Sequence, residues 1–103
     1  MNVTLPTALV LQAMANGRHH GFDIMDATDL PSGTVYPILR RLNDDGLVKS
    51  RWERDAVARK QQRPPRRYYE LTTAGEATLA DARARYRALE MLAARMAPGW
   101  KPA

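Results

Sequence analysis

The chain has 103 residues and a formal net charge of +5, from 16 Lys and Arg against 11 Asp and Glu. This length suits one small domain near the lower limit for a comfortably stable core, so a partner subunit can contribute to stability. The chain has no cysteine, which excludes disulfides, thiolate metal sites and cysteine nucleophiles and fits a cytoplasmic protein, and its longest apolar run, residues 8–11, is too short to span a membrane.

Two helices are expected at the start of the chain. Apolar residues at helical spacing predict the first helix over residues 4–15, and the turn signal Asn16-Gly17 ends it. A shorter second helix is expected over residues 20–27. Its candidate buried residues are Phe22, Ile24 and Met25.

A third helix is predicted from residue 32, in "SGTVYPILRRL", with Ser32 as its N-cap. Its buried face comprises Val35, Ile38, Leu39 and Leu42. Pro37 lies inside this pattern. A proline destabilises a helix least when it lies about one turn from the helix start and faces solvent, so we expect this position for Pro37.

The outward side of this third helix suits DNA. Guanidinium, phenol and hydroxyl groups bind phosphates and base edges, and free N–H groups at the helix start form a phosphate seat. The alternative is a purely structural role, in which Pro37 only bends the helix and Tyr36 packs on a neighbouring part of the same chain. We predict a recognition helix whose candidate DNA contacts are Ser32, Gly33, Thr34, Tyr36, Pro37, Arg40 and Arg41.

A change to alternating periodicity predicts a β-hairpin. "GLVKSRWE" and "RRYYEL" read as its strands, and the polar, basic residues 54–65 between them as a long flexible tip. Eight Lys or Arg lie between residues 49 and 67 against two acids, a local balance of +6, whereas the remainder of the chain carries −1. A solvated charged loop is the alternative, but we expect contacts with phosphates or the minor groove. The candidates are Arg54, Arg59, Lys60, Arg63, Arg66 and Arg67.

One long helix is expected over residues 72–97, capped by Thr72 or Thr73. Apolar residues recur in steps of three and four, as in a short dimerisation seam, although packing on the chain's own first helix would give the same pattern. We favour a homodimer, because two-fold pairing places two recognition helices one DNA turn apart on a pseudo-palindromic operator. The candidate interface residues are Leu79, Ala82, Tyr86, Leu89, Ala93 and Met96.

Three helices followed by a two-stranded hairpin is the winged helix-turn-helix arrangement, in which the hairpin is the wing. The expected fold is therefore mainly α with a small β-hairpin (α+β). We expect residues 1–71 to form the DNA-binding domain, and residues 72–103 the C-terminal dimerisation helix and a short tail.

The residues also resemble a known family. "HGFDI", "LPSGTVYPILRRLNDDGLVKSRWE" and "RRYYELTTAGEATL" are similar to the PadR-like transcriptional regulators over about residues 5–80. The resemblance implies a winged helix domain, a homodimer formed through the C-terminal helix, and transcriptional repression that a small molecule often relieves. Phe22 and Asp23 stand where Tyr and Glu are common, and Thr73 where Pro often follows. The positions that match the family's recognition helix and post-wing strand are Ser32, Gly33, Thr34, Tyr36, Pro37, Arg40, Arg66, Arg67, Tyr68 and Tyr69.

The short C-terminal part resembles the compact members of this family, so an effector site would be built at the dimer interface. The candidate pocket for a small aromatic effector comprises Tyr86, Met91, Met96 and Trp100, although ordinary interface packing explains the same residues.

Other functions have weaker support in the sequence. The acids are scattered and no Gly-rich phosphate loop follows a strand, so we expect no enzyme and no cofactor. The His19-His20 pair with Asp23 lacks a further ligand, which favours a role at the helix entry or on the surface over a metal site. The stronger competitor is a winged helix that contacts protein or RNA without recognising specific DNA.

Overall fold

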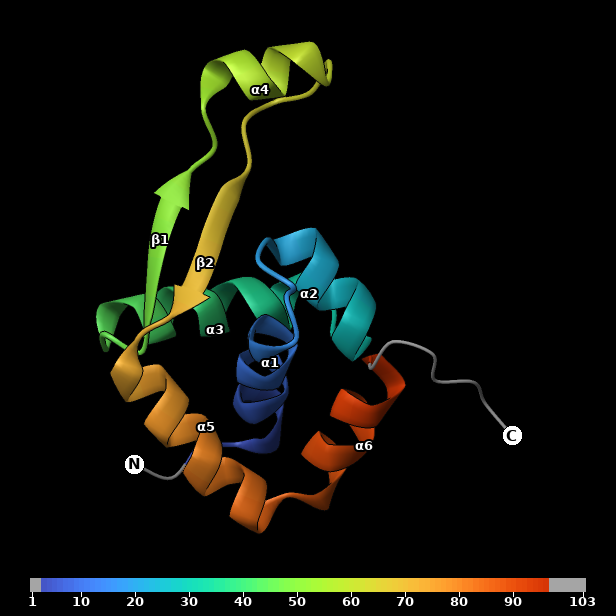
Figure 1. Ribbon diagram of the computed structural model, residues 1–103, viewed down its shortest axis with the longest axis vertical. Helices are drawn as coiled ribbons and strands as arrows, with labels where there is room; N and C mark the ends of the chain where they lie inside the picture. The colour runs from blue at the N-terminus through green and yellow to red at the C-terminus, as the bar shows by residue number, and fades with distance from the viewer. Residues whose placement is uncertain (1–2, 97–103) are drawn as a thin grey trace.

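The first helix, α1 (Leu5–Ala15), runs through the centre of the molecule, and the other long helices pack around it (Figure 1). The computed structural model describes residues 3–96. Because α1 is apolar nearly all round, it is buried on most sides, with Val10, Leu11 and Ala13 fully inaccessible. None of the described helices is both long and apolar enough to cross a membrane.

The helix-turn-helix pair consists of α2 (Gly21–Thr28) and α3 (Ser32–Asp44). Asp29, with a left-handed φ of 60°, ends α2. The N-cap of α3 is Pro31 and not Ser32 as expected, so the helix begins one residue earlier. The fixed φ of Pro31 already has the extended cap geometry, and its carbonyl accepts hydrogen bonds from Thr34 and Val35 at 2.9 and 3.0 Å.

Pro37 does not interrupt α3. The helix continues through it to Asp44, and the proline ring lies on the exposed side, as the sequence pattern predicted. The predicted buried face is confirmed. It comprises Val35, Ile38, Leu39 and Leu42.

The wing is the hairpin of residues 48–71, in which β1 (Val48–Trp52) pairs antiparallel with β2 (Arg67–Leu71). It projects from the helical body and carries a short helix, α4 (Asp55–Lys60), at its far end (Figure 1). The expectation of a structureless tip was therefore wrong. An acid at the start of α4, two bases in its last turn and burial of Ala58 all favour helix here.

The C-terminal part forms two helices, α5 (Thr73–Arg85) and α6 (Arg87–Met96), so the prediction of one continuous helix was wrong. The break is Tyr86, whose backbone is extended at φ −117° and ψ 104°. Its hydroxyl donates a hydrogen bond to the carbonyl of Val3 at 2.8 Å. The bend turns α6 back against α1, and α5 and α6 form a V around it (Figure 1).

The predicted dimer seam consequently lies largely inside one subunit. Leu79, Ala82 and Leu89 are buried in the same core as α1, and Tyr86, Ala93 and Met96 are half-buried. The three buried side chains have no surface to offer a second copy in this conformation. The alternative considered from the sequence, packing on the first helix, is what these three residues do, because steps of three and four mark any buried helix face.

The start of α5 lies tightly against the base of the wing. Thr72 caps the helix by accepting a hydrogen bond from the N–H of Gly75 at 3.1 Å, and its own N–H donates to the Leu47 carbonyl at 3.1 Å. A Cβ at position 75 would lie 2.0 Å from that carbonyl oxygen. Glycine is therefore required here by the close approach of two backbone segments.

Candidate nucleic-acid interface

An open groove separates the wing from the helix-turn-helix pair. Tyr36 of α3 lines this groove together with Arg66 and Arg67 of the wing. The groove therefore joins the two elements, α3 and the wing, that the sequence predicted to contact DNA. The groove is lined by His20, Gly21, Phe22, Tyr36, Pro65, Arg66, Arg67 and Tyr69.

The outward side of α3 is a stripe that is not covered by the rest of the chain. Gly33, Pro37 and Arg40 are exposed and follow one another at helical spacing, while Thr34 is half-buried. Tyr36 is 45% exposed on the flank nearer the wing. Arg41 is exposed on the other flank, where it borders a small cavity with Val3 and Thr4. The recognition-helix candidates are thus all accessible except for part of Thr34, but they do not all point to one side.

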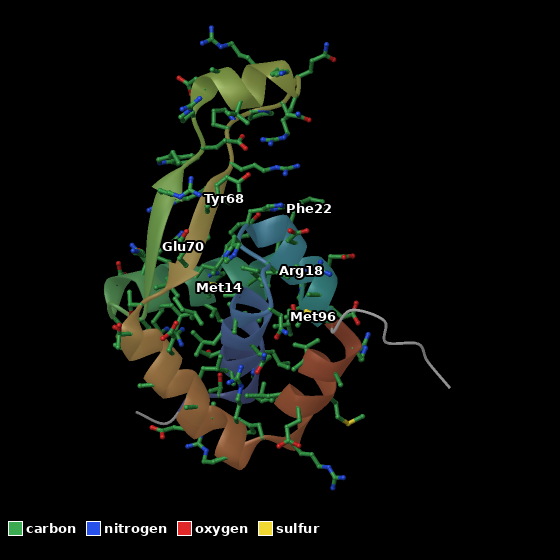
Figure 2. The ribbon with its side chains drawn as sticks, viewed as in Figure 1. Met14, Arg18, Phe22, Tyr68, Glu70 and Met96 are labelled. Atoms are coloured by element: carbon green, nitrogen blue, oxygen red, sulfur yellow. The ribbon has the colours of Figure 1, made fainter. Side chains whose placement is uncertain are left out.

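The far end of the wing carries exposed cations. Arg54, Arg59 and Lys60 are exposed in and next to α4, and nitrogen-tipped side chains surround this end of the molecule in Figure 2. None of the three takes part in an ion pair within residues 3–96. They are available to neutralise phosphates.

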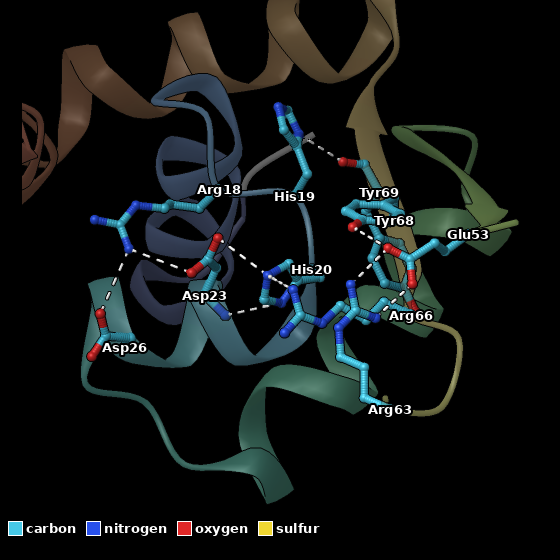
Figure 3. A network of polar contacts seen from close by, with 10 residues as sticks. All are labelled: Arg18, His19, His20, Asp23, Asp26, Glu53, Arg63, Arg66, Tyr68 and Tyr69. Atoms are coloured by element: carbon cyan, nitrogen blue, oxygen red, sulfur yellow. Dashed lines mark hydrogen bonds and ion pairs between the residues drawn. The ribbon is translucent and has the colours of Figure 1, made fainter. Parts of the chain in front are cut away.

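Arg63 forms an ion pair within the wing that the sequence analysis did not anticipate. Its guanidinium forms a two-point ion pair with Glu53, with Nη2 donating to Oε2 at 2.9 Å and Nη1 donating to Oε1 (Figure 3). Tyr68 donates its hydroxyl to the same carboxylate at 2.9 Å. Because its Nη1 and Nη2 already bind a buried carboxylate, Arg63 joins the two arms of the hairpin and is a weaker candidate for DNA contact than Arg59 or Lys60.

The electrostatics of this neck agree with the geometry. The hydrogen bond from Arg63 lowers the pKa of Glu53 to about 2, aided by the Tyr68 hydroxyl and opposed by burial. The same pair raises the pKa of Arg63. Both groups are therefore charged across the ordinary pH range.

The free edge of β2 is covered by the segment that leads into α2. The N–H of Tyr69 donates to the carbonyl of His19 at 2.7 Å, and the His19 ring contacts the Tyr69 carbonyl through Nδ1 at 3.0 Å (Figure 3). His20 pairs with Tyr68 in an isolated bridge. These contacts fix the wing to the helix-turn-helix pair.

His20 also caps α2 and faces the wing. Its Nδ1 accepts from the N–H of Asp23 at 3.4 Å, and its Nε2 lies 3.3 Å from the Asp23 carboxylate and 3.4 Å from Arg66. Burial lowers the pKa of His20, an effect that Asp23 opposes and Arg66 reinforces. The two histidines serve separate structural contacts, and residues 3–96 contain no cluster of three potential metal ligands.

Among the candidate effector residues, Met91 borders a hollow that Tyr86 and Met96 do not line. Met91 is 63% exposed on α6 and borders a shallow hollow with Leu9 and Leu92. Tyr86 and Met96 are half-buried and do not border that hollow. Trp100 lies outside the described residues.

Two exposed aromatic residues were missed as surface features. Phe22 was expected to be buried but is 73% exposed, and it lies at the end of α2 that faces the wing (Figure 2). Trp52, at the end of β1, is 64% exposed. The alternation of β1 indicated that Trp52 shares a face with Val48 and Ser50, but only the packed structure shows that this face is buried at Val48 and exposed at Trp52.

Comparisons with known proteins agree with this geometry. The family model described as "Transcriptional regulator PadR-like family" matches residues 10–81. A PadR-like transcription factor from Bacteroides fragilis is 28% identical, with a TM-score of 0.61 over 90% of this chain and 89% of that one. A PadR family transcription regulator from Clostridium difficile R20291 is 21% identical, with a TM-score of 0.70 over 86% of this chain and 94% of that one.

Another structure similar to this chain is that of BpsR from Bordetella bronchiseptica. It is 21% identical, with a TM-score of 0.64 over 97% of this chain and 69% of that one. Its description concerns the regulation of DNA binding by 6-hydroxynicotinic acid. No curated protein sequence matches the chain.

Proposed function

Because this chain belongs to the PadR-like family of transcriptional regulators, we propose that it binds specific sequences in double-stranded DNA as a homodimeric repressor that a small molecule releases. The observation that carries the proposal is the shared groove between α3 and the wing. An exposed helix face with Tyr36 and Arg40 lies beside a cationic hairpin, so one duplex can contact both.

The two elements have different tasks in this proposal. α3 enters the major groove, where Arg40 can bind a guanine through two hydrogen bonds and thereby contributes sequence discrimination. Arg54, Arg59 and Lys60 on the wing neutralise phosphates, which raises affinity for any duplex. Arg66 and Arg67 at the neck of the wing contact the backbone next to the groove.

A homodimer is proposed to present two such surfaces to a pseudo-palindromic operator. With Leu79, Ala82 and Leu89 buried in their own subunit, the second copy must use outward surfaces. The exposed face of α6 around Met91 is the available apolar patch near the C-terminal end of the described chain. Sedimentation at rising protein concentration tests this, and a monomer at all concentrations would contradict it.

Release by a small aromatic molecule rests on similar proteins. The description of BpsR names 6-hydroxynicotinic acid as a regulator of its DNA binding, and a similar structure, PcaV from Streptomyces coelicolor, is described in complex with its natural ligand. A thermal-shift screen of planar aromatic acids, followed by DNA-binding assays of the hits, tests whether this chain responds in the same way.

The decisive experiment for the proposed function is a gel-shift titration with duplex DNA in graded salt. We expect operator fragments recovered from a random pool to bind more tightly than random duplexes, with affinity falling linearly on a log-log plot against salt. Absence of duplex binding at low salt, together with retention of a protein or RNA partner, would favour the competing function.

A further inference from the structure

Trp52 is a large aromatic residue that the fold leaves in solvent. It occupies the last position of β1, and the residue is 64% exposed. The guanidinium of Arg67, its partner across the hairpin, lies 5.5 Å from the centre of the indole ring. Arg67 in turn donates to Ser50 Oγ at 2.7 Å. The indole is thus held against the sheet by one neighbour while most of its surface stays accessible.

Trp52 lies on the side of the wing that faces α3. Alternation along β1 puts Trp52 on the same face as Ser50, whose register partner is Tyr69. Ser50 Oγ donates to Asn43 Oδ1 of α3 at 3.4 Å, and Tyr69 lines the groove together with Tyr36. The face that carries Trp52 is therefore continuous with the candidate DNA interface.

We propose that Trp52 is a direct DNA contact, with its indole packed against the deoxyribose-phosphate backbone of a duplex bound in the groove. This inference rests on the proposed function. The occupant is a polyanion because residues 49–67, around this ring, carry a local charge of +6, which exceeds the net charge of the whole chain, +5. The flat apolar ring suits sugar faces, and the indole N–H can donate to a phosphate oxygen.

The alternative role for Trp52 is indirect: its ring would orient the guanidinium of Arg67 without itself touching DNA. The two roles differ in what they predict for the bound state. If Trp52 contacts DNA, the duplex shields its indole from solvent. If Trp52 only orients Arg67, its indole stays as accessible in the complex as in the free protein. Removal of an uncharged contact also leaves the salt dependence of binding unchanged, whereas loss of an arginine contact reduces it.

Tryptophan fluorescence separates these roles, because the chain has only two tryptophans. Trp100→Phe leaves Trp52 as the single reporter, and Trp52→Phe leaves Trp100 as its matched control. Acrylamide, an uncharged quencher, is titrated against each variant with and without a random-sequence duplex of about 30 base pairs, roughly three helical turns. We expect the duplex to protect Trp52 from quenching.

Affinity measurements give an independent readout. We expect Trp52→Ala to bind both random and selected duplexes about tenfold more weakly, with an unchanged salt slope and an unchanged circular dichroism spectrum, and Trp52→Phe to retain most of the affinity. If Trp52 stays fully quenchable in a complex that forms normally, or if Trp52→Ala binds like the wild type, the inference fails while the proposed function stands. If the wild-type protein binds no duplex even at low salt, both fail together.

Discussion

The ring of Tyr36 lies directly over Gly21, where α3 crosses the start of α2. A Cβ at position 21 would be 2.6 Å from the hydroxyl oxygen and from one ring carbon of that tyrosine. Gly21 therefore leaves the space that the ring of Tyr36 occupies against the start of α2. The "HG" and "VYP" segments, which are well separated along the chain, are two sides of this single contact.

Gly21→Ala should displace the Tyr36 ring. The ring is the end of a half-exposed side chain and can rotate away, so we expect a modest loss of stability, about 1 kcal/mol. The larger effect should be a loss of discrimination between operator and random DNA. Urea unfolding and competitive gel shifts measure the two effects.

Gly33→Ala is the matched control for Gly21→Ala. A Cβ at position 33 meets nothing within 4 Å, and Gly33 lies in the first turn of α3. The substitution should leave stability unchanged or raise it by about 0.5 kcal/mol. Equal destabilisation by both substitutions would contradict the proposed role of Gly21.

Gly75→Ala should be far more costly. Its Cβ would collide with the backbone carbonyl of Leu47, which cannot rotate away as a side chain can. We expect a loss of about 3 kcal/mol in the free energy of unfolding, together with a loosened wing base. Denaturant unfolding checks the first, and hydrogen exchange at the Thr72 amide, which donates to Leu47, checks the second.

Arg40→Ala should lower the preference for the operator. Loss of a two-point contact with a base costs about 1–3 kcal/mol at the cognate site and much less on random DNA. Arg87→Ala, which removes an exposed arginine at the start of α6 away from the wing, is the control and should change neither affinity. A uniform weakening by Arg40→Ala would instead assign this residue to phosphate binding.

Two arginines of the wing should differ although both belong to one basic segment. Arg59→Ala removes an unpaired cation from α4 and should reduce the magnitude of the log-log salt slope by about 0.9 for a phosphate contact. Arg63→Ala should leave the slope nearly unchanged, because its guanidinium is occupied by Glu53. Salt titrations of DNA binding by both variants measure the two slopes. An equal change in slope would show that the Arg63–Glu53 ion pair opens when the protein binds DNA.

The wing should weaken in acid through Glu53. Its pKa is lowered to about 2 in the folded chain from an ordinary value of 4.5. The contribution to stability is therefore complete above about pH 4.5 and is lost as the pH falls toward 2. Thermal unfolding between neutral pH and acid should show this loss.

Glu53→Gln and Arg63→Gln test the origin of that acid sensitivity. The first removes the titrating group, and the second removes the main cause of its lowered pKa, so both should flatten the acid limb of the stability curve. A Glu53→Gln variant whose stability falls with pH just as it does in the wild type would exclude this carboxylate as the source.

Sequence periodicity alone was sufficient for most of the fold. The buried stripe of α3, the alternation in β1 and the turn at Gly17 are local patterns, and each leads to its element without knowledge of the rest of the chain. The concentration of positive charge in the wing is equally a property of the sequence. The family assignment and the mainly helical α+β fold expected from these patterns are confirmed.

Tertiary packing decided what each apolar or charged residue faces. The spacing of Leu79, Ala82 and Leu89 marks a buried face but does not show which helix covers it. The bend at Tyr86 lets α5 and α6 both pack this face against α1 of the same subunit. Charge counting likewise could not tell that Arg63 is already neutralised, since Glu53 lies on the other arm of the hairpin. Helical and strand periods are set by neighbouring residues, whereas burial and ion pairing depend on partners that only the folded chain brings together.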